Sequence, residues 1–159
     1  MLITPQDFKK RIEFSLCQQF ASEEDLRAFC HEAKTTGVGV ACVNPIYVAR
    51  TVELLGDVDI EISANIGFPF GSHLAEVKAL ETALAVQDGA TQIDMVMNVG
   101  ALKSGQDELA RKDIEAVVAR AEGRVVKVII ETWVLTGEEK VRASQIVEAG
   151  GAHMVKTST

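Results

Sequence analysis

The chain has no run of about 18 apolar residues, so the sequence predicts no membrane-spanning helix. Its first residues, MLITPQDFKK, lack the apolar stretch and small-residue cleavage site of a signal peptide. Positive charge is also scarce, with 16 basic residues against 23 acidic ones and a formal net charge of −7. A nucleic-acid binder needs a basic face. We therefore expect a cytoplasmic protein that has no membrane or nucleic-acid partner.

Cysteine is scarcer still, and its spacing is uninformative. Cys17, Cys30 and Cys42 are odd in number and lack the spacing of metal ligands, so neither a disulfide framework nor a zinc site is expected. Cys17 and Cys30 are expected to be small core residues. With 159 residues, 47% of them hydrophobic and 25% charged, the chain is expected to form one globular domain over residues 1–159.

Short β-branched runs alternate with longer amphipathic stretches along the chain. Helices are expected to begin near Ser22 and Pro45, and because strands separated by helices form βαβ units, the sheet should be parallel. Residues 100–105 are interpreted as a turn between strand and helix, the alternative being an anion-binding loop. The other expected helices span about 72–88, 106–121 and 137–149, and the six expected strands span 12–17, 38–43, 60–66, 92–99, 125–131 and 152–158.

Two α/β architectures fit this order: an open doubly wound sheet and a closed (β/α)8 TIM barrel. Helices cover both faces of an open sheet, so its strands are apolar throughout. Here three strands instead place polar residues at every second position, and such a polar face suits the interior of a barrel. We therefore expect a TIM-barrel type of fold, incomplete because only six of its eight βα units are present. The polar residues are Asp94 and Asn98, Lys127 and Glu131, and Lys156 and Ser158.

The polar face brings two lysines and a carboxylate together. An amine attacks a carbonyl only when it is neutral, and both partial burial and a nearby second cation lower a lysine's pKa. We therefore expect Lys156 to be a nucleophile, with Lys127 lowering its pKa and Asp94 relaying protons. The alternative is a structural network of buried ion pairs that only fills the barrel.

Five segments in collinear order resemble deoxyribose-phosphate aldolases, a family of class I aldolases with a (β/α)8 barrel. They are CVNPIYV (42–48), GFPFGS (67–72), QIDMVMNVGALKSG (92–105), VKVIIETWVLT (126–136) and AGGAHMVKTST (149–159). The resemblance implies cleavage of 2-deoxy-D-ribose 5-phosphate, a small phosphosugar, into acetaldehyde and D-glyceraldehyde 3-phosphate. It also implies that no metal or organic cofactor takes part, and that the protein forms a homo-oligomer of two or more subunits.

The same resemblance assigns roles to individual residues. Lys156 matches the family's Schiff-base lysine and Asp94 its catalytic aspartate. Lys127 matches a lysine that lines the site, and Cys42 matches a cysteine near the substrate. Ser15 stands where the family commonly has a threonine, and we expect it to contact the substrate.

The sequence also departs from the family pattern. Glu13 replaces an aspartate, Phe14 a histidine, and Trp133 a small residue. The family motif continues beyond VKTST, so we expect this chain to lack the last two strands, a further lysine and the phosphate-binding loops. Two alternatives follow: a catalytically silent barrel fragment that serves only as a structural or oligomerising domain, and a class I aldolase that acts on a different phosphosugar.

Overall fold

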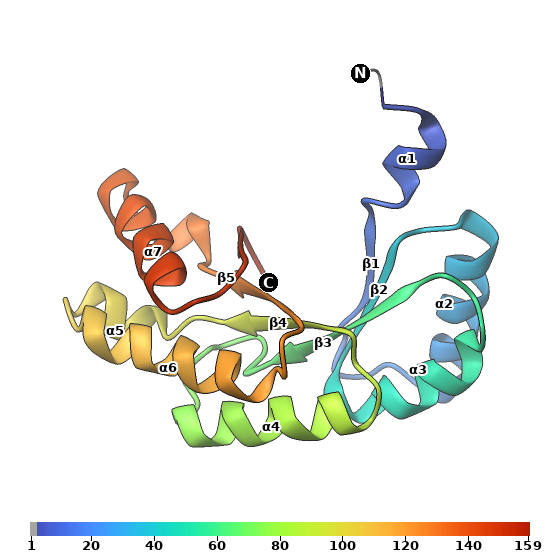
Figure 1. Cartoon of the computed structure of the whole chain (residues 1–159), viewed down its shortest axis with the longest axis horizontal. Helices are drawn as coiled ribbons and strands as arrows, with labels where there is room; N and C mark the ends of the chain where they lie inside the picture. The colour runs from blue at the N-terminus through green and yellow to red at the C-terminus, as the bar shows by residue number, and fades with distance from the viewer. Residues whose placement is uncertain (1–2) are drawn as a thin grey trace.

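The structure, a computed structural model, describes residues 3–159 and contains one parallel sheet with helices along its outer side (Figure 1). Every pair of neighbouring strands is parallel, so the predicted α/β class and parallel sheet are confirmed. The strands are β1 (Glu13–Leu16), β2 (Val40–Val43), β3 (Glu61–Ile66), β4 (Gln92–Val96), β5 (Val125–Ile129) and β6 (Met154–Lys156).

Local sequence accounts for where the longer helices begin. Ser22 and Thr136 each accept a hydrogen bond from the backbone three residues on, and Asp25 and Glu139 bond back to close a capping box. No helix within residues 3–159 has the length and apolarity needed to cross a membrane. The helices are α1 (Pro5–Lys9), α2 (Glu23–Thr36), α3 (Val48–Leu55), α4 (Ala75–Gln87), α5 (Val99–Lys103), α6 (Asp107–Arg120) and α7 (Gly137–Ala149), with 3-10 turns η1 (Pro45–Tyr47) and η2 (Thr132–Val134).

The order of the strands decides between the two expected architectures. The sheet runs β1-β2-β3-β4-β5-β6, so each strand pairs with the next one in the chain. In a doubly wound sheet, the order of the strands reverses at a switch point. Consecutive parallel strands joined by outer helices are instead the arrangement of a (β/α) barrel. Figure 1 shows the sheet curving, with the longer helices on its convex side, α1 beyond the start of β1, and the C-terminus over its concave side. The incomplete-barrel prediction is therefore confirmed for these six units.

The hydrophobic core lies between the convex face and the helices. Alternate residues of each strand point outward into this layer, among them Ala41, Ile93, Val126 and Val128, each fully buried. The opposite set of side chains faces the concave side, where Asp94 lies beside Lys127 in the β4–β5 register. Asp94, Lys127 and Lys156, three of the six polar residues expected in the barrel interior, are therefore on the correct face.

Several strands end earlier than the sequence suggested. The fourth strand stops at Val96 because Asn98 accepts a hydrogen bond from the Ala101 amide and so caps α5. Val99–Lys103, expected to form the end of a strand and most of a turn, are helical here. The fifth strand stops at Ile129, and Glu131 adopts a left-handed backbone (φ 56°). Asn98, Glu131 and Ser158 thus lie outside the strands, contrary to expectation.

One ion pair is buried in the outer layer, between α4 and α6. Lys78 Nζ lies 2.6 Å from Asp113 Oδ2 and also donates a hydrogen bond to the Val96 carbonyl at 2.8 Å. Burial lowers the pKa of Lys78 and raises that of Asp113, and their mutual attraction opposes both changes. Each charge is tolerated there only because the other is present.

Replacing one member of this pair should therefore be costly. We expect Lys78→Met to lower the free energy of unfolding by about 3–5 kcal/mol, because Asp113 is left as an uncompensated buried charge. The double variant Lys78→Met/Asp113→Leu should recover most of that loss, as measured by urea unfolding. Lys112→Met, which removes an exposed lysine beside Glu108 on α6, should cost less than about 1 kcal/mol. An equal loss in the single and double variants would contradict this account.

Candidate active site

Four charged side chains meet on the concave face of the sheet. Lys156 from β6 contacts both Asp94 from β4 and Glu13 from β1. Lys127 from β5 contacts the same two carboxylates, with its Nζ 2.8 Å from Asp94 Oδ1. The charges alternate in sign, so each ammonium lies between two carboxylates and each carboxylate between two ammonium groups. We call these four residues the charge ring.

Burial is uneven around the charge ring. The Asp94 side chain is fully buried and that of Lys127 is 9% exposed, whereas that of Lys156 is 31% exposed. Lys156 also lines a cavity of about 320 Å³ whose wall includes Ser15 and Cys42. Of the four charged groups, the Lys156 amine is therefore the most accessible to a small molecule.

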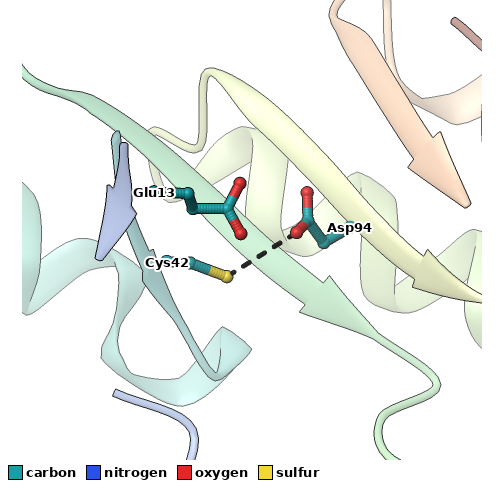
Figure 2. Close-up of side chains that lie close together, drawn as sticks. All are labelled: Glu13, Cys42 and Asp94. Atoms are coloured by element: carbon teal, nitrogen blue, oxygen red, sulfur yellow. Dashed lines mark hydrogen bonds between the residues drawn. The ribbon is translucent and has the colours of Figure 1, made fainter. Parts of the chain in front are cut away.

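Neutral polar groups hold the inner carboxylate in place. Ser63 Oγ donates a hydrogen bond of 2.8 Å to Asp94 Oδ1. The Cys42 thiol donates to Asn65 Oδ1 at 3.3 Å and lies 4.0 Å from Asp94 Oδ2. Figure 2 shows the side chains of Glu13, Cys42 and Asp94 converging from three strands. Asp94 is thus fixed by both charged and uncharged partners.

The same three side chains have atoms within 4.8 Å of one another, a spacing that could hold a metal ion. Their chemistry does not suit one. Both carboxylates are already paired with the ammonium groups of Lys127 and Lys156. The neighbouring Cys17 thiol, burial and the nearby carboxylates raise the pKa of Cys42, so its sulfur stays protonated, whereas a metal binds the thiolate. This donor set is better explained by ion pairing.

The charge ring shifts the pKa of its own members. Burial alone would raise the pKa of Asp94, but the Lys127 and Lys156 ammonium groups hold it below its ordinary value. Burial alone would lower the pKa of Lys156, but Asp94 and Glu13 raise it well above its ordinary value. The sequence predicted a lowered pKa for Lys156. That prediction is wrong for this arrangement, because the two carboxylates outweigh the effect of burial.

The structure brings the five expected site residues to the same region. Lys156, Asp94 and Lys127 belong to the charge ring, and Cys42 and Ser15 line the adjoining cavity. Two of the residues that depart from the family pattern lie elsewhere. Phe14 stacks on Phe29 of α2 with ring centroids 4.8 Å apart, and Trp133 is 80% exposed on η2.

Sequence reasoning missed four contributors to the site. Glu13 bridges both lysines, Ser63 and Asn65 support the inner groups, and Cys17 lies on the cavity wall instead of in the core. A signal was present in the first and third strands. Glu13 and Ser15, like Ser63 and Asn65, recur at every second position, the same pattern that identified the polar face of the later strands.

Comparison with known proteins agrees with this geometry. Residues 3–159 match the model of the DeoC/LacD family aldolases. The chain belongs to this aldolase family. A deoxyribose-phosphate aldolase from Geobacillus sp. (strain WCH70) is 48% identical over 151 residues, which are 94% of this chain and 68% of that protein. One from Streptococcus sanguinis (strain SK36) is 47% identical over 150 residues, with the same two coverages.

Solved structures of the aldolase family share the fold. A structure from Coccidioides immitis superposes with a TM-score of 0.94 at 33% identity, covering 97% of this chain and 61% of that one. The deoxyribose phosphate aldolase from Aeropyrum pernix, described as tetrameric, gives 0.89 at 31% identity, covering 99% and 66%. The chain therefore spans between three fifths and about two thirds of the length of these relatives.

Because the pKa of Asp94 is lowered in the folded state, the free energy of unfolding should depend on pH in the acidic range. A carboxylate with a depressed folded pKa contributes stability that is present above its unfolded pKa, near 3.8, and is lost as the pH falls through the folded value. From pH 5 down to pH 3, we expect the free energy of unfolding to fall less steeply for Asp94→Asn than for the wild-type chain. Chemical unfolding at a series of pH values measures both slopes.

Asp113→Asn gives a comparison of opposite sign. Burial raises the pKa of Asp113, so its removal should make the loss of stability toward low pH steeper. If both variants changed the slope in the same direction, the assignment of the Asp94 effect to the charge ring would be wrong.

Proposed function

We propose that this chain carries the Schiff-base site of a deoxyribose-phosphate aldolase, in which Lys156 is the nucleophile. The substrate would be 2-deoxy-D-ribose 5-phosphate and the products acetaldehyde and D-glyceraldehyde 3-phosphate. The main support is one observation: an accessible lysine amine faces a cavity with a buried carboxylate in direct contact behind it. Membership of an aldolase family supports the same reaction class.

The first chemical step is the release of a proton from Lys156. The raised pKa keeps this amine protonated at neutral pH, and a protonated amine cannot attack a carbonyl. Asp94 is in direct contact with the amine and would accept the proton. We propose that an incoming aldehyde displaces Glu13 from Lys156, which removes one stabilising anion and leaves the Lys127 cation to favour the neutral amine.

The neutral amine would then add to the C1 aldehyde, and protonated Asp94 would return its proton to the departing hydroxyl, so that water leaves, a protonated imine forms and Asp94 is again a carboxylate. Asp94, acting through a water molecule, would remove the proton from the C3 hydroxyl. The C2–C3 bond breaks, its electrons pass into the imine to give an enamine, and glyceraldehyde 3-phosphate leaves. Protonation of the enamine carbon and hydrolysis release acetaldehyde and restore Lys156.

A structural role is the second candidate, and the same charge ring favours it. Alternating charges that satisfy one another could serve only to join β1 to β4, β5 and β6. In that case, Lys156 would remain protonated and unreactive. The two candidates therefore differ in one measurable property, the reactivity of the Lys156 amine toward an aldehyde.

Borohydride trapping measures that reactivity. With acetaldehyde and sodium borohydride, the wild-type chain should gain an ethyl group on Lys156, because reduction fixes the imine. Peptide mapping by mass spectrometry locates the modification. Acetaldehyde carries no phosphate, so the experiment tests the lysine without requiring a phosphate-binding group.

Two variants serve as matched controls for the trapping. Lys156→Met should abolish the fast modification, while Lys103→Met, which removes an exposed lysine paired with Glu139, should leave it unchanged. Modification of Lys156 no faster than that of the exposed lysines would overturn the Schiff-base proposal and favour the structural role.

Glu13 sets the pH at which trapping begins. Because its carboxylate raises the pKa of Lys156, Glu13→Gln should move the pH midpoint of trapping downward by about one unit or more. Glu108→Gln, on the surface of α6, should leave the midpoint in place. An unchanged midpoint in Glu13→Gln would show that Glu13 does not control the amine.

The remaining predictions concern the whole protein. We propose that residues 1–159 form one barrel-type domain and that the protein acts in the cytoplasm on a small phosphosugar, without a cofactor. We also propose that it forms a homo-oligomer, which size-exclusion chromatography with light scattering would measure. The tetrameric description of the Aeropyrum pernix relative supports an oligomer without fixing the number of subunits here.

A further inference from the structure

Cys17 lies at the mouth of the site, directly after the last residue of β1. It is half-buried and lines both the cavity that contains Lys156 and a neighbouring cavity of about 500 Å³. Asn65 Nδ2 donates a hydrogen bond to Cys17 Sγ at 3.0 Å. A thiol with an amide donor on one side and open space on the other is positioned to react with a small molecule.

A second thiol lies on the other side of the same amide. Cys42 Sγ donates to Asn65 Oδ1 at 3.3 Å, so the Asn65 side chain is hydrogen-bonded to both sulfurs. In the β1–β2 register Ser15 pairs with Cys42, so Cys17 is two residues further along on the same face. The two cysteines are therefore diagonal neighbours on one face of the sheet, and both sulfurs are hydrogen-bonded to the same amide side chain.

The surroundings differ sharply for the two thiols. The neighbouring Cys42 thiol, the hydrogen bond from Asn65 and the charge of Lys156 lower the pKa of Cys17 to about 7, although its burial and the Glu13 carboxylate act in the opposite direction. The other charged group on the cavity walls around Cys17 is Glu81 of α4, which accepts a hydrogen bond from the Gly67 amide. Cys42 is held as the protonated thiol, so the pair consists of one half-buried nucleophile at the cavity wall and one buried proton donor.

We propose that Cys17 is an oxidation site for hydroperoxides and that Cys42 converts the oxidised sulfur into a Cys17–Cys42 disulfide. Nothing in the proposed aldolase reaction uses this chemistry. The nucleophile is the Cys17 thiolate, and the oxidant is hydrogen peroxide or an organic hydroperoxide small enough to enter the cavity.

The disulfide forms in two steps. The Cys17 thiolate attacks one peroxide oxygen, the O–O bond breaks, and Cys17 becomes a sulfenic acid while hydroxide (or alkoxide) leaves. The Cys42 sulfur then attacks the sulfenic sulfur and displaces its hydroxyl group. The Cys42 proton passes to that hydroxyl, so one water forms with the S–S bond. Two electrons pass from the two thiols to the peroxide.

To form the bridge, the backbone would have to move, and only the segment that carries Cys17 is free of strand pairing on both sides. Cys42 is inside β2, fixed by strands on both sides, but Cys17 follows the end of β1 and lies outside the β1–β2 ladder. A disulfide needs the two Cα atoms within about 7 Å, so the segment after Leu16 would supply the movement. The bridge would place both sulfurs across the cavity wall beside Lys156 and restrict entry to it.

The test uses the reduced wild-type chain and hydrogen peroxide at neutral pH. Non-reducing peptide mapping should recover a cross-linked peptide pair that contains Cys17 and Cys42, and dithiothreitol should restore both thiols. In a separate measurement without peroxide, alkylation of Cys17 by iodoacetamide should rise with pH with a midpoint near 7. The mass readout is independent of catalysis, so it holds whichever reaction Lys156 performs.

Three variants complete the test. Cys17→Ser should form no intramolecular bridge. Cys42→Ser should accumulate the Cys17 sulfenic acid, which a dimedone probe labels. Cys30→Ala removes a buried thiol on α2 and should retain the bridge. Circular dichroism confirms that each variant is folded. Oxidation of Cys17 no faster than that of Cys30, or a bridge only between two chains, would overturn the proposal.

Discussion

Two lysines and two carboxylates occupy one small space on the concave face, and the positions of four strands depend on how they share it. Lys156 and Glu13 are 143 residues apart in the chain, and their strands lie at opposite ends of the sheet order. Strand pairing alone leaves the distance between those ends undetermined. The contact between the two side chains fixes it, so the curvature of the sheet is maintained partly by electrostatics.

The same interaction sets the chemical state of the site. An amine held by two carboxylates is well positioned and strongly charged, which gives precise geometry but suppresses nucleophilicity. An active form of this site must therefore rearrange at least one ion pair when a substrate enters. Glu13 is the natural candidate for the pair that opens, because its side chain is partly exposed while that of Asp94 is fully buried.

The sequence was most informative where local patterns determine structure. Alternation in the strands was enough to place Asp94, Lys127 and Lys156 on one face, because a strand turns every second side chain the same way. It could not reveal that Glu13 would reach across to both lysines, since that depends on how far the sheet curves. The error in the direction of the Lys156 pKa followed directly, because one of its two anionic neighbours was unknown. Strand ends were misplaced where a side chain such as Asn98 capped a helix.

The buried pair of Lys78 and Asp113 has a consequence for anyone who redesigns this protein. Lys78 also holds the carbonyl of Val96, the last residue of β4, and Asp94 lies only two residues before it. Lys78 thus connects the outer helices to the strand that carries Asp94. A library that repacks the α4–α6 interface for greater heat resistance should therefore keep Lys78, because its amine also holds the end of the strand that carries the site's carboxylate.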